Sequence, residues 1–304
     1  MPIVIYIFTL CAFAIGFTEF ISIGLAASLA GSLHANTAQV GLAVTLYATG
    51  VVVGAPILTA LAAGWPRKRL LLIAMLAFTA GNILAALSTH LPLLLAARLL
   101  SGLAHGVFFA VASSVATRLV APERAGSALS LVFGGVTVAM ALGVPAGTLL
   151  ASMFPWQWIF ALIAIFGLVG LLGMAHWMPA GSGDLATEGP GWHQLSVVLD
   201  RRLLAGACLP LLSYAGSFTL YTYITPLLLS VTHTDIRHGS SILLAYGLGA
   251  AVGNIVGGRM TDRIGMDRAS FCLLTGIAAV LALIGLAQER FELMAILVSA
   301  LGLC

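Results

Sequence analysis

Residues 246–268 read YGLGAAVGNIVGGRMTDRIGMDR, an apolar, glycine-spaced run that ends in a charged turn. Residues 47–69, YATGVVVGAPILTALAAGWPRKR, show the same design 199 residues earlier (246 minus 47). Both copies end a hydrophobic run and begin a basic turn at the same position. The sequence therefore contains an internal repeat, as expected of a chain built from two related halves. Superposing the copies without a gap pairs Tyr47 with Tyr246, Gly50 with Gly249, Gly54 with Gly253 and Arg69 with Arg268.

The composition predicts an all-α integral membrane protein. With 61% hydrophobic residues, 8% charged residues and a mean hydropathy of +1.10, the chain has too little polar surface to cover a soluble globule of 304 residues. Its 34 glycines favour closely packed helices over a transmembrane barrel. The net charge of only +3 argues against a nucleic-acid partner. All four cysteines lie in apolar runs without a nearby ligand set, so we expect no metal and no cofactor.

Nine apolar runs are long enough to be membrane spans, since about 20 residues of helix cross a ~30 Å hydrocarbon layer. A tenth run begins at Phe291 and reaches Cys304 with about 21 Å of helix. We expect residues 1–178 to form a six-helix bundle, residues 179–202 a cytoplasmic linker, and residues 203–304 a second, incomplete bundle of spans seven to nine and part of ten. The nine runs cover roughly residues 3–31, 38–63, 69–89, 91–118, 125–151, 156–178, 203–231, 239–260 and 269–287.

The basic residues predict that the N-terminus lies in the cytoplasm, because cytoplasmic loops of membrane proteins are enriched in Lys and Arg. Arg98 lies well inside the fourth run, and all other Lys and Arg residues fall between runs or at their ends. The side shared with the N-terminus holds Arg67, Lys68, Arg69, Arg118, Arg124, Arg201, Arg202, Arg259, Arg263 and Arg268, whereas the opposite side holds Arg237 and Arg290.

The charged turn of the second copy resembles a signature of the major facilitator superfamily, G-x-x-x-D-R-x-G. The signature implies a cytoplasmic gate made by this turn and by its counterpart in the first copy. The first copy departs from the pattern, because only its basic run is kept. The residues concerned are Gly258, Asp262, Arg263 and Gly265 in the second copy and Arg67, Lys68 and Arg69 in the first.

Three further motifs resemble the drug:proton antiporter-1 family, in particular its arabinose and sugar efflux type. The resemblance implies a proton-coupled antiporter of the bacterial inner membrane, monomeric when complete, that exports a small neutral or lipophilic solute such as a sugar or drug. The motifs are Gly16-Phe-Thr-Glu19-Phe20, Arg98-Leu-Leu-Ser-Gly102-Leu-Ala-His105-Gly106 and the antiporter-like Gly143-Val-Pro145-Ala-Gly147.

Glu19 is the only carboxylate within the nine predicted spans. An ionised side chain near the bilayer centre costs about 2.5 to 3.5 kcal/mol, which favours a functional reading, here as the proton carrier. The alternative is a permanent structural ion pair with Arg98. Arg98 does not release its proton usefully, so it would tune Glu19 or hold an anionic group. His105 lies on the same helix face, about 10 Å along the axis, and would carry a proton or hydrogen-bond a neighbouring helix.

Span five carries small residues at every fourth position, which allows close helix packing, and a proline that would bend it. We expect a conformational seam at Gly143, Pro145 and Gly147. In spans seven and eight, polar side chains would line a substrate cavity, although interfacial tyrosines and helix-to-helix hydrogen bonds explain them equally well. These cavity residues are Tyr214, Ser217, Tyr221 and Asn254.

Two other functions are compatible with the composition: a ten-span drug or metabolite exporter and a nontransporting, truncated remnant. The 199-residue offset covers six spans, which argues against two five-span repeats. An enzyme is the least favoured class, because HExxH, GxSxG and glycine-rich nucleotide loops are absent from the sequence. The residues do not separate a sugar from a lipophilic drug.

Overall fold

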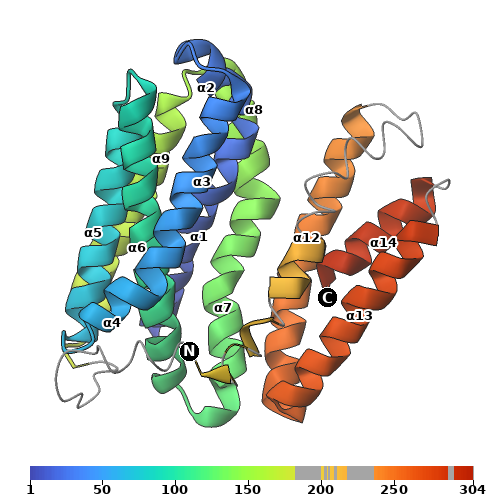
Figure 1. Ribbon diagram of the computed structural model, residues 1–304. Coiled ribbons are helices and arrows are strands. Elements are labelled where there is room, and N and C mark those ends of the chain that lie inside the picture. The colour runs from blue at the N-terminus through green and yellow to red at the C-terminus, as the bar shows by residue number, and fades with distance from the viewer. Residues whose placement is uncertain are drawn as a thin grey trace. The chain divides into compact units, whose positions relative to one another are not determined.

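The computed structural model describes residues 1–181, 200–201, 204, 206–208, 211–217, 236–286 and 291–303. The regular elements defined within these residues are helices, so the predicted all-α class is confirmed (Figure 1). The chain divides into two compact units, Met1–Val197 and Val198–Cys304, and each is described by itself.

Within its described residues, the first unit contains six helices that are long and apolar enough to be spans. Two of them, the second and the fifth, include a π-helical turn, and the first is followed by a short helix. In chain order the elements are α1 (Ile3–Gly24), α2 (Ala26–Ser32), α3 (Thr37–Val53) with the π-helical turn Gly54–Leu58 and α4 (Thr59–Leu61), α5 (Arg67–Ala86), α6 (Leu91–Arg118), the 3-10 turn Pro122–Arg124, α7 (Ala125–Val138) with the π-helical turn Ala139–Gly143 and α8 (Val144–Met153), and α9 (Gln157–Trp177).

The second unit contains α12 (Ile236–Ile264), α13 (Met266–Leu286) and α14 (Phe291–Leu303). Among the described residues, seven helices are long and apolar enough to cross a membrane: six in the first unit and α13. They correspond to predicted spans one to six and nine. The predicted eighth span lies within α12, which is not one of the seven, and most of the predicted seventh span falls outside the described residues.

Local sequence signals explain where several helices begin and end. Asn36 and Gln39 form a reciprocal capping box at the start of α3, which satisfies backbone N–H groups that the first helical turn leaves free. Gly265 separates α12 from α13 with a φ of 84°, a left-handed conformation that favours glycine. The aligned residue of the first copy, Pro66, has a φ of −55° and precedes α5 instead.

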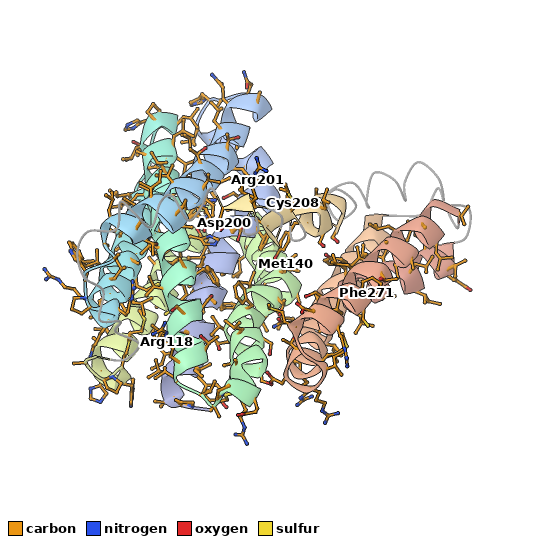
Figure 2. All side chains as sticks on the ribbon, turned by 60° about the horizontal axis from the view of Figure 1, so that its bottom comes forward. Arg118, Met140, Asp200, Arg201, Cys208 and Phe271 are labelled. Atoms are coloured by element: carbon orange, nitrogen blue, oxygen red, sulfur yellow. The ribbon has the colours of Figure 1, made fainter. Side chains whose placement is uncertain are left out.

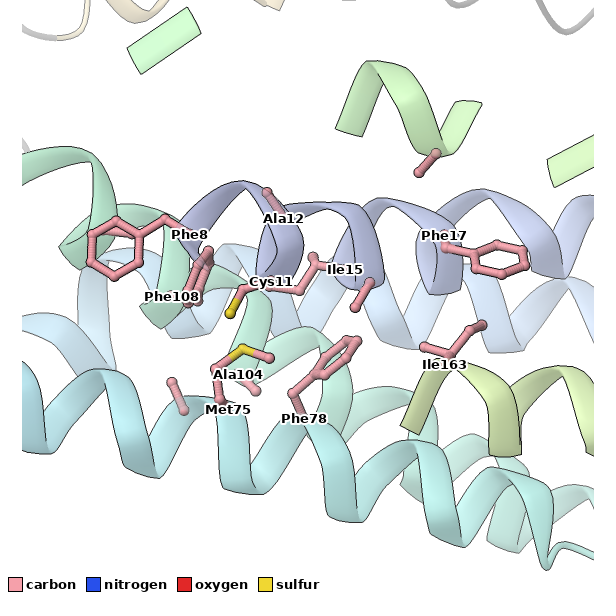
Figure 3. Close-up of a cluster of buried hydrophobic side chains, with 14 of the residues drawn as sticks. Phe8, Cys11, Ala12, Ile15, Phe17, Met75, Phe78, Ala104, Phe108 and Ile163 are labelled. Atoms are coloured by element: carbon pink, nitrogen blue, oxygen red, sulfur yellow. The ribbon is translucent and has the colours of Figure 1, made fainter. Parts of the chain in front are cut away.

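The core of the first unit surrounds α1. Figure 3 shows Phe8, Cys11 and Ile15 of α1 beside Met75 and Phe78 of α5, together with side chains of α6 and α9. All five are fully buried. Lipid tails are as apolar as these side chains, so close van der Waals packing rather than burial itself must hold the helices together.

Large apolar side chains also cover the outer faces of the helices, as contact with lipid requires. Leu172 of α9 is 59% exposed, and Phe271 of α13, labelled in Figure 2, is 73% exposed. In a soluble protein such a surface would drive aggregation. The exposed apolar side chains therefore support the assignment of a multi-pass membrane protein.

The internal repeat appears in the structure as the same helix contact in both units. A methyl group added to Gly54 would lie 2.3 Å from the carbonyl oxygen of Leu103, and one added to Gly253 would lie 2.3 Å from that of Leu303. Only glycine permits backbones to approach this closely.

The reverse contact repeats as well. A methyl group on Gly102 would lie 2.1 Å from the Tyr47 carbonyl oxygen, and one on Gly302 would lie 2.4 Å from that of Tyr246. The contact of α12 with α14 therefore matches the contact of α3 with α6, and α14 corresponds to the first part of α6.

Candidate functional site

Arg98 is the centre of a polar site inside the first unit. Its side chain is 1% exposed, and Nη1 donates to the carbonyl oxygen of Thr18 at 2.9 Å and to the Thr18 hydroxyl at 3.1 Å. Nε donates to the carbonyl oxygen of Ala43 at 3.4 Å, and Cζ lies 4.1 Å from the centre of the Tyr47 ring. Nη2 is buried without a hydrogen-bond partner. The guanidinium is thus held in place with one donor group unused.

Thr18 and Asn82 connect this site to α5. The Thr18 hydroxyl accepts from Arg98 and donates to Asn82 Oδ1 at 2.7 Å, while Asn82 Nδ2 donates to the carbonyl oxygen of Phe78 at 2.9 Å. Thr18 and Asn82 are both buried. Buried polar groups of this kind are costly unless paired, so the network fixes α1, α5 and α6 in one arrangement.

Tyr47 of α3 links the site to His105, which lies further along α6. The Tyr47 hydroxyl and His105 Nδ1 are 2.9 Å apart, within hydrogen-bonding distance. The His105 ring lies 4.9 Å from the ring of Phe109, which is stacked on Phe133 of α7 at 5.0 Å. Polar and aromatic contacts therefore run without a break from Arg98 to α7.

Glu19 follows Thr18 on α1 and is half-buried. In the described part of the chain, no hydrogen bond or ion pair within 4 Å joins its carboxylate to Arg98. The expected alternative of a permanent structural ion pair is therefore not what the structure shows. Backbone carbonyls, the Thr18 hydroxyl and the Tyr47 ring hold Arg98 instead.

The predicted cytoplasmic turns differ between the two copies. In the second copy, Gly258 is buried, Asp262 is half-buried, and Arg263 and Gly265 are exposed. In the first copy, Arg67 is half-buried, Lys68 donates to the carbonyl oxygens of Ala175, at 2.9 Å, and of Met178 at the end of α9, and the guanidinium of Arg69 lies 5.2 Å from the Trp65 ring centre. The basic run of the first copy thus makes contacts within its own unit.

The small residues of span five pack against α1. Methyl groups on Gly143 and Gly147 would lie 3.3 Å and 2.7 Å from the Phe17 ring. The π-helical turn that ends at Gly143 directly precedes the Val144–Pro145 step, and Figure 2 labels Met140 within this turn. A π-helical turn in the middle of a helix is frequently found at functional sites.

The sequence analysis predicted a bend at Pro145 but neither π-helical turn, and the turn in span two is Gly54–Leu58. Its signal was available, because Pro56 follows Gly54 by two residues just as Pro145 follows Gly143. Both helices widen by one residue where a proline removes a backbone donor.

The four predicted cavity residues belong to the second unit. Tyr214 is 63% exposed, Ser217 and Asn254 are half-buried, and Tyr221 lies outside the described residues. Within the described part of the chain, no group of three His, Cys, Asp or Glu residues could hold a metal ion.

The family model of the Major Facilitator Superfamily matches residues 8–304. The chain belongs to this superfamily. Its members are transporters rather than enzymes, and the match sets aside the ten-span alternative. The chain is 40% identical over 252 residues to the "uncharacterized MFS-type transporter YtbD" of Bacillus subtilis. The matched region covers 83% of this chain and 63% of YtbD.

Two other relatives carry functional names. A chloramphenicol resistance protein of Streptomyces lividans is 34% identical over 265 residues, with 86% of the chain and 68% of that protein covered. A "probable sugar efflux transporter" of Helicobacter acinonychis is 32% identical over 264 residues, with 85% and 66% covered.

Among solved structures, the proton:xylose symporter XylE matches with a TM-score of 0.78 at 13% identity, over 99% of this chain and 78% of XylE. The predicted superfamily and its two-bundle fold are confirmed.

Proposed function

We propose that the protein is a proton-coupled antiporter that exports a small neutral or lipophilic solute, a sugar or a drug, across the bacterial inner membrane. The observation that carries the proposal is the unused, buried Nη2 donor of Arg98, whose Nη1 group bonds to Thr18, the residue next to Glu19. Charged side chains at membrane depth usually mark ion and proton pathways.

Arg98 and Glu19 provide a means for a proton to change the structure. The carbonyl oxygens and the Tyr47 ring hold the Arg98 guanidinium but carry no full negative charge to neutralise it. An ionised Glu19 carboxylate could accept a hydrogen bond from Nη2, and a protonated one no longer offsets the positive charge. Protonation of Glu19 therefore changes the free energy of this arrangement, which is what a coupled conformational change requires.

The direction and the substrate class rest on the relatives and on the charges. One relative is named for chloramphenicol resistance and another for sugar efflux. Apart from Arg98 and Glu19, the first unit presents few charged groups at membrane depth, which suits an uncharged solute.

The remaining predicted residues are assigned by the same proposal. The turn Gly258, Asp262, Arg263 and Gly265, with Arg67 to Arg69, would form the cytoplasmic gate. Gly143, Pro145 and Gly147 would form the moving seam between states, since the π-helical turn beside them can absorb a local rearrangement. Tyr214, Ser217, Tyr221 and Asn254 would line the substrate cavity, with residues 179–202 as the linker between bundles.

Glu19→Gln tests the proposal, because glutamine keeps the shape of the side chain but cannot ionise. Inverted vesicles that contain the protein are given chloramphenicol or arabinose, and the resulting proton movement is followed with a pH-sensitive dye. We expect Glu19→Gln to abolish proton movement while membrane insertion is retained. The matched control is Glu123→Gln, at an exposed position in the 3-10 turn. Normal proton movement in Glu19→Gln would exclude Glu19 as the carrier.

A further inference from the structure

Tyr47 touches both of the basic residues that the sequence analysis placed on one face of α6. The ring face covers the Arg98 guanidinium, with 4.1 Å between Cζ and the ring centre, and the hydroxyl lies 2.9 Å from His105 Nδ1. Tyr47 itself is 2% exposed. A single side chain of α3 thus joins two groups that are separated by two turns of α6.

The close approach at Gly102 makes this double contact possible. Gly102 lies between Arg98 and His105 along α6, and a methyl group there would lie 2.1 Å from the Tyr47 carbonyl oxygen and 3.0 Å from its Cα. Any side chain at position 102 would push α3 away. Tyr47 would then no longer contact Arg98, His105 or both of them.

The hydroxyl of Tyr47 restricts the chemistry of His105. A neutral imidazole has one donor and one acceptor nitrogen, so a hydroxyl that donates to Nδ1 places the ring proton on Nε2. A protonated His105 can only donate at Nδ1, and the hydroxyl must then turn to accept. The protonation of His105 and the direction of this hydrogen bond are therefore linked.

The second unit offers an internal comparison for the packing. Tyr246 lies against Gly302 as Tyr47 lies against Gly102, but the residue aligned with Arg98 is Val298 (302 minus 4, as 102 minus 4). The tyrosine–glycine packing is therefore kept where the cation is absent. Packing alone does not account for the contacts that Tyr47 makes with Arg98 and His105.

We propose that Tyr47 is a positioning residue of the proton-coupling site, which holds Arg98 with its ring and sets the hydrogen bonding of His105 with its hydroxyl. This inference rests on the proposed function, because it assumes that Arg98 takes part in coupling. The charged and titratable groups that face Tyr47 are Glu19 from α1 and Arg98 and His105 from α6.

The first test does not depend on transport. The full chain is labelled with 15N-histidine in lipid, and the ring-nitrogen signals of His105 are assigned as those lost in His105→Asn. Tyr47→Phe keeps the ring over Arg98 but removes the hydroxyl, so we expect the His105 signals to shift. Tyr246→Phe is the matched control and should leave them unchanged. Unchanged His105 signals in Tyr47→Phe would overturn the proposal.

The second test is a double-mutant cycle on the pH profile of substrate-driven proton movement. Tyr47→Phe and His105→Asn should each change the rate at the most affected pH by about fivefold, as expected for the loss of one hydrogen bond, and the double variant should add nothing further. Tyr246→Phe should retain the wild-type profile. Additive effects, or a wild-type profile in Tyr47→Phe, would overturn the proposal. If the wild-type protein moves no protons, the proposed function fails, whereas the histidine signals still decide whether Tyr47 sets His105.

Discussion

Gly50→Ala should weaken the contact between α3 and α6. An added methyl group would lie 2.6 Å from the carbonyl oxygen of Leu99 and 2.7 Å from the backbone nitrogen of Leu103. Ordinary contact begins at 3.4 Å, so the shortfalls are 0.8 Å (3.4 minus 2.6) and 0.7 Å (3.4 minus 2.7). Both neighbours are backbone atoms that cannot rotate away, and the two helices must separate.

Overpacking of this kind costs about 1 to 3 kcal/mol. For a unit of this size we therefore expect a melting temperature that is lower by about 2 to 12 °C. The matched control is Gly41→Ala in the same helix, where nothing lies within 4 Å of an added methyl group. Both variants gain the same helix propensity from alanine, so their difference isolates the contact.

The assay uses the buried Cys11 as a reporter of unfolding. The other three cysteines, Cys208, Cys272 and Cys304, are replaced by serine, and the purified protein is heated in detergent with a thiol-reactive dye. Dye reaction then marks the opening of the core around α1. If Gly50→Ala melts at or above Gly41→Ala, the reasoning from backbone approach is wrong.

Three further predictions concern the first unit. Thr18→Val keeps the shape of the side chain but removes the hydroxyl that joins Arg98 to Asn82, so the protein should lose about 1 to 3 kcal/mol of stability in the same melting assay. The control Thr45→Val removes an exposed hydroxyl that is bonded within its own helix and should not lower the stability. Lys68→Met removes the donor to the carbonyl oxygens at the end of α9 and should lower the stability by about 1 kcal/mol. Arg69→Met, at an exposed position, should lower it less, and equal melting temperatures of the two variants would contradict a capping role for Lys68. With a cytoplasmic N-terminus, an impermeant maleimide should label Gly31→Cys in intact cells and Gly64→Cys only in inverted vesicles, and the opposite pattern would reverse the topology.

Much of the fold could be predicted because membrane helices leave a strong signal in the sequence. The six spans of the first unit were located from length and hydropathy alone, which is all that a lipid environment requires of them. The stripe of small residues in span five likewise predicted a close helix contact. Its partner, α1, could not be predicted, because a small residue permits contact with any helix that presents a matching surface.

The site was less predictable, since its contacts depend on which helices are neighbours. Arg98 and His105 stood out as charged or titratable residues in an apolar run. Tyr47 did not, because a tyrosine in an apolar helix is ordinary and its partner His105 lies 58 residues away. Asn82 did carry a signal, as a polar amide in an apolar run like Asn254, but its partner Thr18 lies 64 residues away. An ion pair between Arg98 and Glu19 was the structural alternative to a coupling role. Two backbone carbonyls and the Thr18 hydroxyl accept hydrogen bonds from Nε and Nη1 instead, and Nη2 is left without a partner.

The valine at position 298 separates the packing of this helix contact from the chemistry of the site. Both copies have the glycine contacts that set the distance between backbones, because a larger residue there would collide with main-chain atoms. Arg98 of the first copy corresponds to a valine in the second. The contact between the two helices therefore forms with or without the cation, so the residue at this position sets the chemistry of its unit without setting how the helices pack.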